Sequence, residues 1–180
     1  TEYILDDGSA ENGWTINPGY DVWLGNLFPV EDSGNILSFD IYSQANSGAT
    51  DEVTIDVFDS NHNLIGSSES FTLAADDWVT IEVPNIEFDG EFYAMIHWNM
   101  INGSTNFLGS DETGSYAGSN LDYYYSDGSW SLLHELAQSN PGVFMIRTTA
   151  IIGGEPIRIA LDNSNILYKK LSEREIKENL

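Results

Sequence analysis

The chain contains no cysteine, and it contains no lysine or arginine before residue 147. Without cysteine, neither a disulfide nor a thiolate metal site can form, and the cellular compartment stays open. No apolar run approaches the roughly eighteen residues that cross a bilayer as a helix, so we expect no membrane insertion. A chain of 180 residues can still bury a core of its own, and its length fits one domain with an appendage better than two full domains.

Charge divides the chain into two zones. Residues 1–146 carry 24 of the 29 aspartates and glutamates, whereas residues 151–180 hold five acidic and five basic side chains. A surface this acidic repels phosphate groups, which argues against nucleic acid and anionic membranes as partners. Three explanations fit the missing cations: carboxylates that bind Ca²⁺, a surface adapted for solubility in salty surroundings, or a domain without sites for trypsin-like proteases.

Strand chemistry dominates the middle of the chain. Four runs there alternate between apolar and polar residues or are rich in β-branched and aromatic residues, and Gly, Asn, Asp or Pro bounds each of them. These runs are 35–44, 53–60, 78–83 and 91–100. We expect Pro84 to end the third run, because proline cannot donate to a sheet. The last run is apolar on both faces, which predicts a strand at the centre of a sheet.

Alternation also assigns the faces of these strands, because successive side chains point to opposite sides of a sheet. In the first run, Leu37, Phe39 and Ile41 share one face, and in the second run Asp56 points outward. The second face of the last run holds Tyr93, Met95 and His97.

The clearest hairpin signal lies at residues 123–133, where Asp127-Gly128 supplies the positive φ angles of a tight turn. The apolar runs at 2–5 and 143–152 are expected to pair and to bring the ends of the domain together. Residues 20–30 lack clean periodicity and predict an irregular, partly buried crossing with one strand in it.

With no convincing helix before residue 153, this pattern predicts an all-β fold. We expect an antiparallel β-sandwich of jelly-roll type, with a closed barrel as the alternative. The module spans residues 1–152, and residues 153–180 form a short strand and helix linker tail. In that tail, 157–161 predicts a strand, and a capping-box pattern at Ser172–Glu175 predicts a short helix at 173–180.

Four segments of the chain resemble a known family: 6–14, 75–79, 90–99 and 140–147. They are similar to the jelly-roll accessory modules of secreted Bacteroidetes proteins, and through these to the cleaved-adhesin domains of gingipains. The resemblance covers residues 1–152. It implies a secreted or cell-surface bacterial protein, a structural Ca²⁺ near the start of the sandwich, and a module that binds a host protein, a glycan or a neighbouring domain.

The acidic opening loop is the best metal candidate. Asp6, Asp7 and Glu11 lie within six residues, and a loop of this size can fold carboxylates and backbone carbonyls around one Ca²⁺, which takes six to eight oxygen ligands. The alternative is a solvated turn in which Asp7-Gly8 serves the backbone geometry. The acidic pairs elsewhere, including Asp111-Glu112, predict solvated loops, although Asp40 or Asp111 could complete the metal site from another strand.

Aromatic residues give the second candidate site, because sugars stack on exposed rings while carboxylates and amides bind their hydroxyl groups. We predict that the hairpin side chains Tyr123, Tyr124, Tyr125 and Trp130 bind a ligand, with simple packing as the alternative. Trp78 and Trp98 are expected in the core, because they lie in apolar strands.

No catalytic pattern stands out. The three histidines have no metal-ligand spacing, and neither a nucleophile elbow nor a zinc-protease motif occurs. We therefore expect a module without enzymatic activity that serves adhesion or binds a carbohydrate or an extracellular protein. The alternatives are a structural spacer attached to a secreted protease or hydrolase, and a hydrolase in its own right.

Overall fold

The computed structural model describes residues 1–137, 142–153, 160–161 and 167–168. These residues form short and medium strands with one small helix, α1 (Leu133–Ala137). The strands are β1 (Glu2–Tyr3), β2 (Asn12–Trp14), β3 (Asp21–Phe28), β4 (Ser33–Gln44), β5 (Thr54–Asp59), β6 (Leu64–Ser67), β7 (Asp77–Asp89), β8 (Phe92–Asn99), β9 (Phe107–Asp111), β10 (Asp122–Ser126), β11 (Ser129–Leu132), β12 (Val143–Phe144), β13 (Ile146–Ile152), β14 (Ala160–Leu161) and β15 (Leu167–Tyr168).

The strands form an antiparallel β-sandwich, as the alternation predicts. Strands β2 to β9 divide between two sheets, in the orders β2-β9-β4-β7 and β3-β8-β5-β6. Consecutive strands mostly change sheet, and the first strand of this set pairs with the last, which is the jelly-roll arrangement. Strand β8 lies between β3 and β5, so the prediction of a central strand at 91–100 is confirmed.

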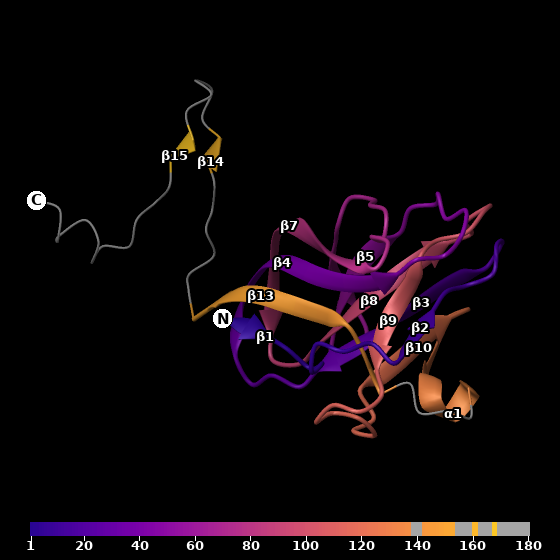
Figure 1. Cartoon of the computed structure of the whole chain (residues 1–180). Helices are drawn as coiled ribbons and strands as arrows, with labels where there is room; N and C mark the ends of the chain where they lie inside the picture. Colours follow the sequence, from indigo (N-terminus) through magenta and orange to yellow (C-terminus); the bar gives the residue numbers. More distant parts are fainter. Residues whose placement is uncertain (138–141, 154–159, 162–166, 169–180) are drawn as a thin grey trace, which may run out of the picture.

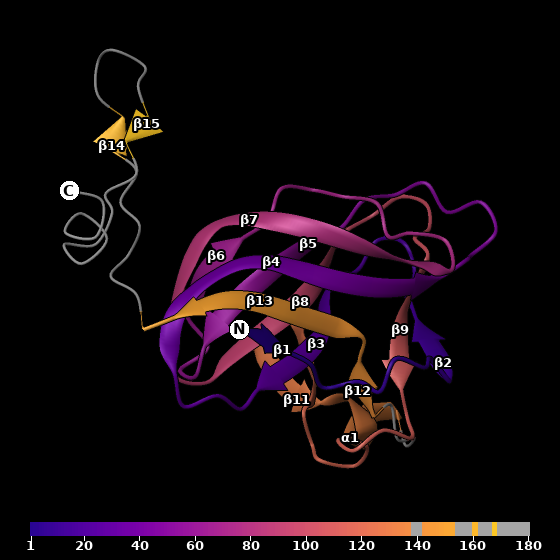
Figure 2. The same cartoon turned by 60° about the vertical axis from the view of Figure 1, so that its left-hand side comes forward.

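Later strands widen both sheets. The β10–β11 hairpin joins the edge of β3 and completes a six-stranded sheet. Strand β13 joins β4 and also pairs with β1, so the predicted pairing of the first and last strands is confirmed. Figure 1 shows β1 beside β13, and Figure 2 shows β7, β4 and β13 curving together as one layer.

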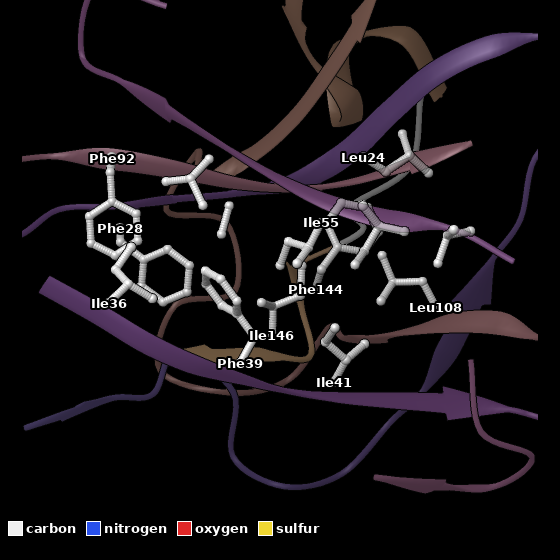
Figure 3. Packing of buried hydrophobic residues seen from close by; sticks show 14 of the residues in the cluster. Leu24, Phe28, Ile36, Phe39, Ile41, Ile55, Phe92, Leu108, Phe144 and Ile146 are labelled. Atoms are coloured by element: carbon white, nitrogen blue, oxygen red, sulfur yellow. The ribbon is translucent and has the colours of Figure 1, made fainter. Parts of the chain in front are cut away.

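The core lies between the two sheets. Fully buried side chains from both layers meet there, among them Phe28, Phe92 and Ile55 from one sheet and Ile36 and Phe39 from the other (Figure 3). Burial of such side chains is the main stabilising term for a sandwich of this size.

A polar tie crosses the core at Asn26 on β3. Its side-chain nitrogen donates to the carbonyl oxygen of Phe144 at 2.7 Å, and its side-chain oxygen accepts from the Phe144 amide at 2.8 Å. Asn26 is fully buried, and both bonds satisfy the backbone of β12, which belongs to the opposite sheet. The tie explains why the segment that contains Asn26 shows no clean apolar alternation.

That segment is more regular than predicted. Residues 20–30 contain the eight-residue strand β3, which pairs with β8 along its whole length and with β10 on its other side. Gly25 weakens the pattern because the backbones of β3 and β8 approach closely at this point: a Cβ there would collide with the carbonyl oxygen of Ala94. The one strand expected in this segment is therefore confirmed, whereas the expected irregularity is wrong.

Strand β7 does not end at Pro84. It continues to Asp89, and a register shift in its pairing with β4 falls between Ile36 and Ser38. Proline is tolerated because β7 lies at a sheet edge and Pro84 falls inside this irregularity. Leu37 is left out of both ladders at this point, and Ile36 instead joins Phe39 and Ile41 in the core, so the prediction that Leu37 shares their face is wrong.

A tight turn at Asp127-Gly128 and the short helix α1 complete the sandwich. Asp127 and Gly128 have φ angles of 51° and 79°, as the predicted hairpin turn requires. After β11 the chain forms α1, whereas no helix was expected before residue 153. Its first residues are held by Asp122, which accepts from the His134 amide at 2.7 Å and contacts the His134 ring at 2.8 Å.

In the tail, β14 pairs with β15, and β14 falls within the predicted strand at 157–161. The predicted helix at 173–180 lies outside the described residues.

Candidate functional site

The outer face of the six-stranded sheet is lined with aromatic side chains. Five strands and one turn contribute to this surface, which we call the aromatic face. Its members are Trp23, Phe58, His62, Tyr93, Tyr123, Tyr125, His97 and Trp130, with Met95 and Leu27 beneath them. Apart from the two histidines, they form a second hydrophobic cluster, which meets the main core at Leu27.

Several of these rings stack in series. Trp130 lies between His62, at 4.1 Å and 8° between ring planes, and Tyr125, at 4.7 Å and 19°. Trp23 follows at 4.8 Å from Tyr125, tilted by 45° rather than stacked, and it stacks on His97 at 3.7 Å and 12°. The series therefore runs from one histidine to the other, and both faces of Trp130 are covered by rings of the same chain.

Trp130 reaches well beyond its own strand. It lies on β11 at the edge of the sheet, yet its ring is 5.0 Å from Phe58 on β5 and 4.9 Å from Tyr93 on β8. The hairpin must therefore fold over the sheet, across β3. In the register of the sheet, Gly25 of β3 lies between Tyr123 of β10 and Met95 of β8.

Carboxylates hold the Trp23 and His97 end of the series. Asp56 accepts from the Trp23 indole nitrogen at 2.7 Å and lies 3.2 Å from Nδ1 of His97, while Asp21 lies 2.6 Å from Nε2. Burial alone lowers the pKa of His97, but the hydrogen bonds with Asp56 and Asp21 outweigh it, and the pKa is raised. Burial likewise raises the pKa of Asp56, and the bonds from His97 and Trp23 lower it by more.

The His62 end is more open. His62 is exposed, and its Nε2 lies 3.2 Å from the Tyr93 hydroxyl. Burial and the neighbouring Tyr123 raise the pKa of Tyr93 to about 12, so this hydroxyl stays protonated at neutral pH. The two ends thus differ in their polar partners, since His97 contacts two carboxylates whereas the exposed His62 contacts one hydroxyl group.

The structure brings three of the four predicted ligand-binding residues together. Tyr123, Tyr125 and Trp130 lie in the aromatic face, whereas Tyr124 points to the other side of the sheet and packs against the main core. Trp98 is fully buried, as predicted. Trp78 is not a core residue: it is half-buried on the outer side of the other sheet, where the Arg147 guanidinium lies 4.1 Å from its ring centre.

Sequence reasoning missed Trp23, His62 and His97 as members of this surface. Alternation within 91–100 had already placed Tyr93 and His97 on one face, and it had placed Asp56 outward. What was lacking was the pairing of β8 with β3, because residues 20–30 were not recognised as a regular strand.

The predicted metal ligands have different surroundings from one another. Asp6 accepts two bonds from Arg147, at 3.1 Å from Nε and 2.6 Å from a terminal nitrogen, and its side chain is fully buried. The Gly8 amide donates to the same carboxylate. Because a guanidinium already neutralises Asp6, that carboxylate does not fit as a ligand of Ca²⁺ in this arrangement.

Asp7 and Glu11 face each other across Ser9. The Ser9 hydroxyl lies 2.7 Å from Asp7 and 2.8 Å from Glu11, and hydrogen bonds from Ser9 lower the pKa of both carboxyl groups. Both side chains are exposed, and each carboxylate can accept further contacts in addition to the bond from Ser9. Within the part of the chain that the structure describes, no three histidine, aspartate or glutamate side chains gather as a metal-binding group. A Ca²⁺ held by Asp7, Glu11 and backbone oxygens stays a prediction.

Asp111 belongs to this loop as well. It is fully buried and accepts from the amides of Asp7, Thr113 and Gly114 at 2.6–2.9 Å. The expectation of a solvated Asp111 is therefore wrong, because this carboxylate satisfies three amides that would otherwise lack partners. Glu11 also accepts from the Glu112 amide at 2.9 Å, so the two acidic segments lock together.

One hollow of the described surface lies away from the aromatic face. It has a volume of about 370 Å³ and lies where β1 meets the end of β3, with Tyr3, Phe28 and Tyr116 among its walls. Three carboxylates, those of Glu2, Glu31 and Asp32, also line it. Tyr3 donates to Asp32 at 3.3 Å, so part of this polar lining is already engaged. We therefore assign the candidate site to the aromatic face.

No protein-family model matches the chain, and no curated protein matches it significantly. Among the described residues, no helix is both long and apolar enough to cross a membrane. The assignment of a function therefore rests on the fold and on the aromatic face.

Proposed function

We propose that this domain is a non-catalytic binding module of a secreted or cell-surface multidomain protein, and that the aromatic face binds its ligand. We favour a glycan as the ligand and take an extracellular protein as the other outcome of a screen. The observation that supports this most directly is the composition of the outer sheet face.

A sandwich normally places polar residues on the outer face of an antiparallel sheet. Here four of the outward positions on β3, β10 and β11 are Trp23, Tyr123, Tyr125 and Trp130, and all four are half-buried. Apolar surface of this extent on an otherwise acidic module marks a contact site. The same ring and carboxylate combination suits sugars, whose C–H faces stack on rings and whose hydroxyl groups donate to carboxylates.

Asp21 supplies such an acceptor. Its side chain is 48% exposed, and one of its oxygens bonds to His97, which leaves the other turned toward solvent. The acidic surface disfavours phosphate-bearing ligands. A neutral glycan therefore suits the charge of the site better than a nucleic acid or an anionic lipid.

The setting in a secreted bacterial protein, and the structural Ca²⁺, rest on the resemblance of residues 1–152 to cleaved-adhesin-like modules. The acidic opening loop is consistent with that metal through the exposed carboxylates of Asp7 and Glu11, although both oxygens of Glu11 already accept hydrogen bonds, from Ser9 and from the Glu112 amide.

A glycan array, run beside a panel of extracellular matrix proteins, tests the proposal. We expect the wild-type domain to bind at least one glycan and Trp130→Ala to lose at least tenfold in affinity. Trp78→Ala is the matched control, because it removes a half-buried tryptophan from the outer face of the other sheet. Equal binding by Trp130→Ala and wild type would contradict the site, and a ligand found only among the proteins would replace the glycan.

The second candidate function is a structural spacer, whose aromatic face packs against a neighbouring domain of the same polypeptide. The observation that favours the spacer is that His62 and Tyr125 cover both faces of the Trp130 ring. Rings that are already stacked on one another can pack together, as one surface, against a neighbouring domain. Hydrogen exchange of a longer polypeptide separates the two functions. A spacer shows protection of β10 and β11 that depends on the neighbouring domain, and a binding module shows protection that depends on the ligand.

A further inference from the structure

Among the members of the aromatic face, His62 differs from the others. It is the exposed one, and it comes from the turn between β5 and β6 rather than from a strand. Its backbone has a φ of 65°, in the left-handed region that side chains other than glycine rarely adopt. Its ring nevertheless lies nearly parallel to the indole of Trp130, with 8° between the planes and 4.1 Å between the ring centres.

We infer that the imidazole of His62 occupies a ring-binding subsite on Trp130, and that a pyranose ring of the ligand takes its place there. This inference rests on the proposed function and names the subsite at which the glycan stacks. His62 is then a specificity-determining residue, because a ligand must compete with it.

The turn does not need the imidazole to keep its shape. One carboxylate oxygen of Asp59 accepts from the amides of Asn61 and Asn63 at 2.8 and 2.9 Å, and the His62 amide donates to the Asp59 carbonyl at 2.9 Å. These bonds join backbone groups of the turn to Asp59, and none of them involves the His62 side chain. The imidazole can therefore leave the indole while the turn stays folded.

The platform beneath the imidazole stays in place when it leaves. Tyr125 covers the opposite face of Trp130 at 4.7 Å, and Phe58 packs edge-on against Trp130 at 5.0 Å with 85° between the planes. Phe58 and Tyr93 are buried, so the indole is supported from below and from one side. Departure of His62 exposes a flat, rigid ring face, which is what a sugar stacks on.

The polar contact of the imidazole also matches a sugar. Its Nε2 lies 3.2 Å from the Tyr93 hydroxyl, so the ring presents one flat face to Trp130 and one polar atom to Tyr93. A pyranose offers the same pairing, a face of C–H bonds and an equatorial hydroxyl group. Once His62 has left, the Tyr93 hydroxyl can bond to that group.

The test uses the full chain with 5-fluorotryptophan in place of its five tryptophans and follows the Trp130 signal by ¹⁹F NMR. Trp130→Phe assigns that signal. The probes are the methyl glycosides of β-glucose, β-galactose, α-mannose and β-N-acetylglucosamine. We expect at least one probe to shift the Trp130 signal, and to bind His62→Ala about two- to tenfold more tightly than wild type, because the ring no longer has to displace an aromatic stack.

Two further variants sharpen the result. His62→Phe keeps a ring on the indole and is expected to bind more weakly than His62→Ala. Asn61→Ala changes the same turn without touching the imidazole and is expected to match wild type. Weaker or unchanged binding by His62→Ala overturns the subsite but leaves the proposed function standing, provided that wild type binds the probe in a Trp130-dependent way. If no probe shifts the Trp130 signal in any variant and the glycan array is also blank, both proposals fail.

Discussion

The pair formed by Arg147 and Asp6 gives a quantitative prediction about stability. Arg147 is the first cationic side chain in the chain, apart from histidine, and it fastens the acidic opening loop to β13. The Asp6 carboxylate is fully buried, while the Arg147 side chain is 24% exposed and also lies over Trp78. The hydrogen bonds and charge of Asp6 raise the pKa of Arg147, so the cation persists throughout the accessible pH range.

Because the two partners differ in burial, their removal should differ in cost. Arg147→Met leaves a buried carboxylate with the Gly8 amide as a partner, and breaking a buried pair in this way costs about 3–5 kcal/mol. The partial exposure of Arg147 puts the expectation at about 3 kcal/mol. Asp6→Asn keeps one oxygen as acceptor and leaves a cation that water can reach, so we expect a loss of about 1–2 kcal/mol.

Urea unfolding followed by tryptophan fluorescence measures these losses. The double variant Arg147→Met/Asp6→Asn should cost at least about 1 kcal/mol less than the sum of the two single variants, because the second change removes the buried charge that the first one strands. Trp78→Leu controls for the lost ring contact, which is worth about 0.5–1 kcal/mol. Strictly additive losses, or a larger loss for Asp6→Asn than for Arg147→Met, would refute the reasoning.

Three further predictions concern the metal, the pH dependence and proteolysis. The melting temperature should be several degrees higher in millimolar Ca²⁺ than in EDTA, and Mg²⁺ should not raise it. Asp7→Asn/Glu11→Gln should abolish this rise, whereas Asp6→Asn should not. No rise in the wild type would contradict the proposed metal site. Wild type should be about 1 kcal/mol more stable than His97→Gln at mildly acidic pH, below about 6.5, and this difference should disappear as the pH rises through the elevated folded pKa of His97. At still lower pH the difference should also fall, because Asp56 becomes protonated. A flat difference between about pH 5 and 9 would contradict this reasoning. Trypsin should not cut after Arg147 in the native domain, because this residue lies inside β13, between β1 and β4. Mass spectrometry should therefore detect a fragment that ends at Arg147 only under unfolding conditions. Its appearance in buffer would show that β13 opens locally.

The faces of the strands were predictable wherever one strand kept a strict period of two. In β8, the alternating side chains divide between the main core and the aromatic face as expected, with Trp98 in the first and Tyr93 in the second. The Asp127-Gly128 turn was equally readable, because a two-residue hairpin needs positive φ at both positions and few residues supply it. These features depend on local backbone geometry, which sequence encodes directly.

The errors occur where a distant segment alters the local pattern. Leu37 satisfies the alternation of its own run, but the shift in register against β7 moves Ile36 into its place. Asn26 resembles a loop residue until the backbone of Phe144 is placed beside it. Asp111 resembles a solvated acid until the amides of its own turn and of Asp7 converge on it. In each example the deciding partner is either far away in the sequence or is a backbone group.

The candidate site depends on the same kind of long-range placement. The hairpin sequence identified Trp130 and Tyr125, but nothing local indicates that Trp130 crosses β3 to meet Phe58, or that a turn more than sixty residues earlier covers its ring with His62. The ring is covered because Asp59 holds the backbone of the turn that carries His62, and this turn places the imidazole over the indole. The ring therefore has two physical roles that compete: with His62 in place it is a packed surface, and without His62 it is a stacking platform. Tighter binding of a pyranose probe by His62→Ala would support the second role, whereas the dependence of β10 and β11 protection on a neighbouring domain or on a ligand decides between the spacer and the binding module.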